Sequence, residues 1–182
     1  VVIDPDDAST TSAPSAISIE VLPLNDAPEV FSNNQAAKYY EGSDPIRMLS
    51  DLTFEDIDSS KISEIRIRGD LPDGATLVAP DLYGFLETSE AGVAVFKGPN
   101  SISIQNAREY LSAIKFYSTS EDLTTSSELR SKDLILNVSV TDEEGATSAE
   151  VQKVVRLFDI NDAPEFVWSN PDEAITITEN NE

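Results

Sequence analysis

The chain has 182 residues, of which 40% are hydrophobic, so it is long enough and apolar enough to fold into one domain with its own core. It carries 34 acidic and 12 basic residues, and the resulting net charge of −22 disfavours binding to nucleic acid or to anionic membrane surfaces. Because His and Cys are absent, the composition excludes a Ser-His-Asp triad, a thiol nucleophile and a His/Cys zinc site.

Other classes of function are also disfavoured. No apolar run approaches the roughly 18 residues that span a bilayer, so we expect no direct membrane insertion. The scattered glycines form neither a dinucleotide-binding motif nor a P-loop. Glycosidases use a pair of carboxylates, but such pairs arise by chance among so many acidic residues and carry no information here. With no other catalytic motif, we expect no enzyme. The oxygen ligands of these acidic residues suit hard cations such as Ca²⁺ or Mg²⁺. The alternative explanation of the acidic composition is a solvated surface adapted to salty surroundings.

A repeated linker frames the chain. The pentapeptide Asn-Asp-Ala-Pro-Glu occurs at residues 25–29 and again at residues 161–165. Alternating apolar residues precede both copies, around Ile19 in the first case and around Val155 in the second. Because the Pro removes a ladder hydrogen bond and favours extended backbone before it, each copy marks the place where the chain leaves one sheet for the next.

The two linkers predict a tandem array of domains. Residues 1–25 are interpreted as the C-terminal hairpin of a preceding repeat, residues 26–162 as one complete repeat, and residues 163–182 as the first strand of the next. The chain starts at Val1 rather than at Met and shows no signal peptide, so we expect a segment of a longer protein.

Within the complete repeat the pattern mostly predicts strands. Alternating or continuous apolar residues predict strands, in chain order, near residues 65–68, 93–96, 102–104, 134–140 and 151–158. Turn residues separate them at 70–74, 97–100 and 142–145. The segment from Asn106 to Ile114 has helical spacing of its apolar residues, with Asn106 as the expected N-cap. The fold class is therefore predicted to be all-β, an antiparallel Ig-like sandwich with one short helix.

Residues 158–166, Phe-Asp-Ile-Asn-Asp-Ala-Pro-Glu-Phe, resemble the linker between cadherin domains, Asp-x-Asn-Asp-Asn-Ala-Pro-x-Phe, without its third Asn. Residues 138–145, Val-Ser-Val-Thr-Asp-Glu-Glu-Gly, resemble the Val-x-Ala-x-Asp-x-x-Gly hairpin of cadherins. The Asn-Asp-Ala-Pro form, together with residues 110–117 and Arg130, is more similar to the cadherin-like repeats of large bacterial and marine adhesins. The resemblance covers both junctions and most of residues 26–166, although residues 69–128 exceed an ordinary cadherin domain. It implies a cadherin-like β-sandwich in a tandem array.

Cadherins bind calcium between neighbouring domains, so the resemblance implies a calcium site at each junction, with one or two ions in each. The implied ligands at the N-terminal junction are Asn25, Asp26, Asp56, Asp58 and Asp142. Those at the C-terminal junction are Glu41, Asn161 and Asp162, with Glu128 or the neighbouring Glu121 and Asp122 replacing an Asp-Arg-Glu motif that is not intact. Clustered carboxylates repel one another, and a cation reverses that repulsion. Asp and Asn also cap turns where no metal is present, which is the alternative.

These features predict a calcium-stiffened repeat of a structural or adhesive protein at the cell surface or in the extracellular space. Its expected partners are adjacent repeats of the same chain, and other cell-surface proteins or glycans. The alternative is a spacer or carbohydrate-binding module of a secreted enzyme. The tripeptide Asn137-Val-Ser139 is an N-glycosylation sequon that would make the protein a glycoprotein in a eukaryotic source.

Overall fold

The computed structural model describes residues 6, 15–90, 92–124, 130–160, 166–167 and 176–177. The elements in chain order are β1 (Glu29–Phe31), β2 (Ala37–Tyr40), β3 (Ile46–Arg47), β4 (Thr53–Glu55), β5 (Lys61–Arg68), β6 (Ala75–Val78), β7 (Leu86–Glu90), β8 (Val93–Ser103), α1 (Ile104–Ala113), β9 (Lys115–Ser118), β10 (Ser131–Asp142), β11 (Val151–Phe158), β12 (Phe166–Val167) and β13 (Thr176–Ile177). The helix is neither long nor apolar enough to cross a membrane, and no other helix of the described residues is either.

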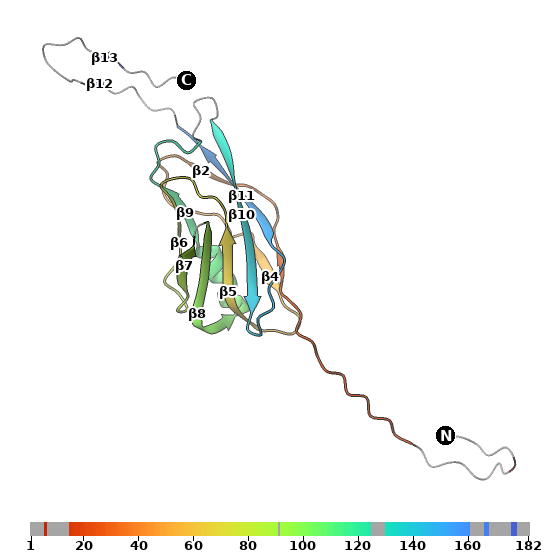
Figure 1. Ribbon diagram of the computed structural model, residues 1–182. Helices are drawn as coiled ribbons and strands as arrows, with labels where there is room; N and C mark the ends of the chain where they lie inside the picture. The colour runs from red at the N-terminus through yellow and green to blue at the C-terminus, as the bar shows by residue number, and fades with distance from the viewer. Residues whose placement is uncertain are drawn as a thin grey trace.

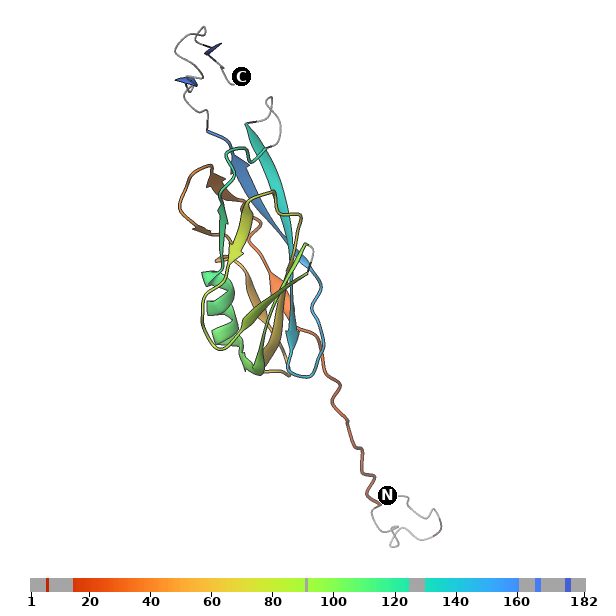
Figure 2. The same cartoon turned by 60° about the vertical axis from the view of Figure 1, so that its left-hand side comes forward.

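The larger layer is a six-stranded sheet with the strand order β2-β11-β10-β5-β8-β7 (Figure 1). Its pairs are antiparallel except β2 with β11, which is parallel. The three-stranded sheet β3-β9-β6 and α1 lie on one side of this sheet, as Figure 2 shows. Side chains such as Ile65, Phe96 and Phe116 are fully buried in the core. The predicted fold class is confirmed: the protein is a β-sandwich with one short helix.

The first strand changes sheets. The segment that enters the sandwich from the linker forms two short strands, of which β1 pairs with β4 and β2 pairs with β11. The intervening residues 32–36 form no strand, and Asn34 has a φ of 58°. Asn tolerates this left-handed backbone better than most residues, and the segment carries the chain from the β1–β4 pair to the six-stranded sheet.

The helix is confirmed with a different N-cap. It begins at Ile104, and the side chain of Ser103 accepts a hydrogen bond from the backbone N–H of Asn106 at 3.2 Å. Asn106 is therefore in the first turn and is not the N-cap that the sequence predicted. Ala107, Tyr110 and Leu111 are buried on the core side, in agreement with the helical spacing.

The turn predicted at residues 97–100 is wrong, because these residues lie inside the long strand β8. The pairing of β8 with β5 shifts between Ile62 and Glu64, so the Gly-Pro segment forms a bulge instead of a turn. A bulge accommodates a Pro because the ladder is interrupted there. A Cβ on Gly98 would lie 2.9 Å from the carbonyl oxygen of Gly84, so the position requires Gly.

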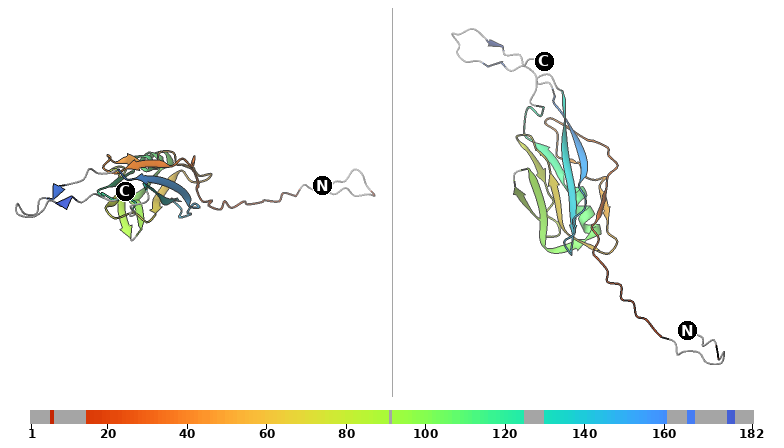
Figure 3. Two further views of the ribbon diagram at one scale, coloured as in Figure 1. Left: turned by 90° about the horizontal axis from the view of Figure 1, so that it is seen from above. Right: turned by 45° about the vertical axis from the view of Figure 1, so that its right-hand side comes forward.

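The two ends of the chain leave the sandwich at opposite ends (Figures 1 and 3). Residues 15–24 form no strand and extend away from the sandwich, with Ile17 87% and Ile19 83% exposed. The partner expected for this segment in a preceding repeat falls outside the described residues. Beyond the second linker, β12 pairs with β13. The domain boundaries therefore stay a prediction.

Candidate functional site

Three separate segments meet where the N-terminal linker enters the sandwich. Asn25 and Asp26 belong to the linker, Asp56 and Asp58 lie in the loop between β4 and β5, and Asp142 is the last residue of β10. We call these five residues the N-terminal cluster. The alternation of the strands places the ends of β4 and β10 and the start of β5 at the same pole, which explains why residues so distant in sequence lie together.

Direct hydrogen bonds join these segments. The Nδ2 of Asn25 donates to the Oδ2 of Asp142 at 2.8 Å, and the backbone N–H of Asp26 donates to the Oδ2 of Asp58 at 3.0 Å. The Oδ1 of Asp56 accepts from the N–H groups of Asp58 at 3.1 Å and Ser59 at 2.8 Å, which holds the loop in a turn. The linker is thus attached to both the β4–β5 loop and the end of β10.

Asp142 is fully buried. Its Oδ1 accepts hydrogen bonds from the backbone N–H groups of Glu144, Gly145 and Ala146 at 2.8, 2.6 and 3.0 Å. Burial by itself would raise the pKa of Asp142, but the hydrogen bonds from Asn25 and from these N–H groups outweigh it and lower the pKa below its ordinary value. The cluster therefore keeps a buried negative charge at neutral pH.

Two oxygen atoms of the N-terminal cluster are buried without a hydrogen-bond donor among the described residues: Oδ1 of Asn25 and Oδ2 of Asp56. Such buried acceptors cost free energy unless something binds them. Amide and carboxylate oxygens are the ligands that Ca²⁺ prefers, so the donor set fits this ion. Among the residues that the structure describes, no three acidic side chains come close enough together to hold a metal ion by themselves. A cation here would need the amide of Asn25, backbone oxygens or ligands from a neighbouring unit as well.

The opposite pole contains Glu41, at the end of β2. Its side chain is largely buried, and its Oε2 accepts a hydrogen bond from the backbone N–H of Ile160 at 2.8 Å. The backbone N–H of Glu41 donates to the carbonyl of Phe158 at 2.9 Å. Glu41 is therefore directly beside the start of the second linker, as the cadherin resemblance implies. Asn161, Asp162 and Glu128 fall outside the described residues, so the rest of the predicted C-terminal site stays a prediction.

The alternative ligands proposed for this pole were Glu121 and Asp122. Glu121 is exposed, and the Oδ1 of Asp122 accepts a hydrogen bond from the backbone N–H of Thr124 at 3.1 Å. This bond from the second residue along is typical of a turn stabilised by an Asp side chain. The structure thus gives Asp122 a role in its own turn.

The sequence analysis missed Asp159. Its Oδ1 accepts a hydrogen bond from the backbone N–H of Leu123 at 2.8 Å, and its other carboxylate oxygen accepts from the hydroxyl of Thr124. It ties the second linker to the loop after β9. Asp159 is the first Asp of the linker motif, but Pro23 is at the matching position of the first linker. The two linkers therefore share no acidic residue at this position, and the repeat does not point to Asp159.

The two poles are far apart. Asp142 ends β10, while Ser131 at the start of that strand pairs with Phe158, the residue whose carbonyl binds Glu41. The 12 residues of β10 span about 40 Å at the usual rise of a strand. Any ions bound at the two poles would therefore occupy two separate sites.

Comparison with known proteins gives little further guidance. No model of a protein family and no curated protein matches the chain. A non-cellulosomal cohesin from the archaeon Archaeoglobus fulgidus aligns with 74% of this chain and 93% of its own, at 14% identity and a TM-score of 0.36. The E. coli chaperone DraB aligns with 76% of this chain and 58% of its own, at 10% identity and a TM-score of 0.28. Both scores are too low to relate this chain to either protein, and the β-sandwich assignment rests on the strand pairing itself.

Proposed function

We propose that the chain is a cadherin-like, calcium-binding repeat of a structural or adhesive extracellular protein, in which calcium stiffens the junctions between sandwiches. One observation carries the proposal: the linker residues Asn25 and Asp26 are hydrogen-bonded to Asp142 and Asp58 of the sandwich. The linker motif is therefore part of the same cluster as the acidic residues that the resemblance assigns to calcium.

The charge and hydrogen bonding of the N-terminal cluster support a cation there. The four acidic residues of this cluster belong to a chain whose net charge is −22, so their mutual repulsion is not offset by the rest of the molecule. Calcium, when bound, supplies positive charge and accepts the otherwise unpaired oxygens as ligands. Asn25 and Asp26 would hold the ion from the linker side, and Asp56, Asp58 and Asp142 from the sandwich side.

Stiffening follows from where the candidate ligands lie. Residues on both sides of the junction would share an ion, so bending at the linker would break ligand bonds. Without calcium the linker is held by the two hydrogen bonds from Asn25 and Asp26 and by its entry into β1. At the other pole, Glu41 would take the corresponding role together with Asn161 and Asp162, and Asp159 anchors that linker to the sandwich.

Thermal unfolding with and without calcium tests the proposal. A ligand that binds only the folded form stabilises it by about 1.4 kcal/mol at a tenfold excess over Kd. Extracellular calcium modules bind at roughly 0.1–1 mM, so we expect the Tm to rise by a few degrees in millimolar calcium and to fall in chelator. Asp58→Asn should reduce the rise, whereas Asp44→Asn, which removes an exposed charge from the loop after β2, should leave it unchanged. Identical melting curves in calcium and in chelator would contradict calcium binding.

A further inference from the structure

A large apolar side chain is exposed at the pole where the first linker enters the sandwich. Ile57 lies between Asp56 and Asp58, in the loop that the N-terminal cluster holds in place. Its side chain is 87% exposed, more than any other large apolar side chain of the described residues from 29 to 160. Single exposed apolar residues are common on protein surfaces, but this one separates two candidate calcium ligands. The loop therefore presents an apolar side chain directly beside the proposed ion.

The opposite pole has a matching apolar surface. Tyr40 and Phe158 end the neighbouring strands β2 and β11, and their rings stack with a centroid distance of 4.8 Å. Tyr40 directly precedes Glu41, and Ile160 directly precedes Asn161, so this surface also neighbours candidate ligands. Tyr40 is 45% and Ile160 51% exposed. We call Tyr40, Phe158 and Ile160 the exit patch.

The first linker contains the counterpart of the exit patch. Leu24 directly precedes this linker, at the position that Ile160 has before the second, and it is likewise exposed. Two residues further on, the backbone N–H of Asp26 donates to the carboxylate of Asp58 at 3.0 Å. Leu24 and Ile57 are thus exposed apolar residues on the two segments that this hydrogen bond joins. An apolar residue from each side therefore reaches the junction.

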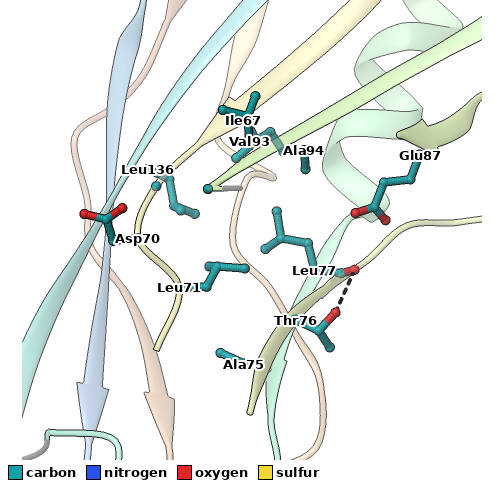
Figure 4. A pocket seen from close by; sticks show the side chains of 12 residues that line it. Ile67, Asp70, Leu71, Ala75, Thr76, Leu77, Glu87, Val93, Ala94 and Leu136 are labelled. Atoms are coloured by element: carbon teal, nitrogen blue, oxygen red, sulfur yellow. Dashed lines mark hydrogen bonds between the residues drawn. The ribbon is translucent and has the colours of Figure 1, made fainter. Parts of the chain in front are cut away.

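The cavity on the flank of the sandwich is a separate feature (Figure 4). It has a volume of about 330 Å³, and Ile67, Leu77 and Leu136, which line it, are buried core residues. Its lining includes neither Ile57 nor any member of the exit patch. Leu86 is the next most exposed large apolar side chain of the described sandwich after Ile57, and it lies on the edge strand β7, away from both linkers. It provides a control position for a test at the poles.

We propose that Ile57 packs against the exit patch of the preceding repeat, so that an apolar contact closes each junction beside its calcium. The inference rests on the proposed array of calcium-binding repeats, in which the exit pole of one repeat meets the entry pole of the next. Burying Ile57 and the exposed ring of Tyr40 against each other removes apolar surface from water, which is favourable. Excluding water also lowers the local dielectric constant, which strengthens the attraction between the ion and its carboxylates.

The covalent connection decides which partner reaches the exit patch. Ile160 is followed directly by the second linker, so the next folded unit of the proposed array is tethered within reach of the patch. A tethered partner has a high effective concentration, which gives even a small contact an advantage over free partners. The occupant of the exit patch is therefore a second repeat of the same kind, through the residue that corresponds to Ile57.

The absence of Cys from the chain makes disulfide trapping a direct test. Residues 1–162 are joined to a second copy of residues 27–182, so that the chain's own Asn-Asp-Ala-Pro-Glu linker connects two complete repeats. Tyr40→Cys or Ile160→Cys in the first repeat is combined with Ile57→Cys in the second, and oxidised glutathione serves as the oxidant. A disulfide forms only between residues that approach closely, so its rate of formation reports the contact. The matched control has Leu86→Cys in place of Ile57→Cys.

We expect at least one of the two Ile57→Cys pairs to form its disulfide about tenfold faster than the matched Leu86→Cys pair in calcium. Because the replaced side chains are exposed or half-exposed, the reduced variants should melt like the parent. Equal rates for the Ile57→Cys and Leu86→Cys pairs would overturn the proposal.

A calcium titration of the single chain distinguishes this contact from the proposed function on which it rests. Saturable calcium shifts at the N-terminal cluster without trapping would remove the apolar contact and leave the calcium site. Trapping that is as fast in chelator as in calcium, with no saturable shift, would support the contact and remove the calcium site.

Discussion

The Nδ2 of Asn25 donates a 2.8 Å hydrogen bond to the Oδ2 of Asp142, although the two residues are 117 positions apart. The bond attaches the linker that enters the sandwich to the turn at the end of its longest strand, β10. The same carboxylate binds three backbone N–H groups of that turn through its other oxygen. Asp142 therefore stabilises the hairpin and positions the linker at once.

Replacing Asp142 tests its structural role separately from any ion. In Asp142→Ala the backbone N–H groups of Glu144, Gly145 and Ala146 lose the buried carboxylate that accepts their hydrogen bonds. Hydrogen bonds to a charged group contribute about 1.5–3 kcal/mol, so we expect the free energy of unfolding to fall by about 3 kcal/mol. Urea unfolding in chelator measures it. Asp44→Ala, an exposed carboxylate, should change the free energy by less than about 0.5 kcal/mol, and an equal effect of the two variants would show that the turn does not depend on Asp142.

A buried ion pair offers a second test. The Nζ of Lys153 lies 2.5 Å from the Oδ1 of Asp51 and 2.6 Å from the carbonyl oxygen of Gln35, and only 3% of the Lys153 side chain is exposed. Removing one partner of a buried pair leaves an uncompensated charge, so Lys153→Ile should cost about 3–5 kcal/mol of unfolding free energy. Ile17 stands at the matching distance before the first linker, and Ile is therefore chosen as the replacement.

The control for this test is the double variant Asp51→Leu/Lys153→Ile. Replacing both charges with apolar groups removes the unpaired Asp51, so most of the lost stability should return. Chemical unfolding of the parent, of the single variants Lys153→Ile and Asp51→Leu, and of the double variant gives the coupling free energy. A double variant as unstable as the sum of the single variants would mean that the two side chains do not interact energetically.

Tyr110 predicts how stability changes at high pH. Its hydroxyl is buried without a hydrogen-bond partner among the described residues, and its pKa is raised to about 12. In the unfolded chain the phenol titrates near pH 10, so the unfolded state loses a proton that the folded state keeps, and stability falls as the pH rises from about 10 toward 12. This group accounts for a loss of about 2 kcal/mol by pH 12.

The variant Tyr110→Phe should lack this alkaline loss and should be as stable as the parent at neutral pH, because it removes an unpaired buried hydroxyl. Tyr117→Phe, on β9, serves as the control for the general effect of losing a phenol. Urea unfolding between about pH 8 and pH 11.5 distinguishes them. If Tyr110→Phe loses stability with pH as steeply as Tyr117→Phe, another group controls the alkaline transition.

Long strands with clear alternation could be predicted from the sequence, and short edge strands could not. The segment 151–158 coincides with β11, and segments within β5 and β10 were also found, because these strands have one face in the core and one in solvent. By contrast, β3 and β4 have only two and three residues, too few to show a period. The turn expected at residues 97–100 failed because a bulge absorbed its Gly and Pro.

The grouping of the N-terminal cluster followed from the linker motif, since no periodicity links Asp58 or Asp142 to Asn25. The same motif placed Glu41 beside the second linker. It gave no indication of Asp51, whose partner Lys153 is 102 positions away and interrupts an otherwise apolar strand face. Such a pair depends on tertiary contacts between elements, so it is visible only once the layers are in place.

The most direct test of the central claim is a calcium titration followed by backbone amide NMR of the full chain. If calcium binds as proposed, the amides of Asp26, Asp58 and Glu144 should shift together and saturate at one calcium concentration, because they belong to the hydrogen-bonded cluster that would hold the ion. In Asp58→Asn these shifts should require at least tenfold more calcium, while the amide of Ile160 at the other pole should respond as in the parent chain. Saturable shifts elsewhere with these amides unmoved, or no saturation at millimolar calcium, would contradict the assignment of the N-terminal cluster as a calcium site.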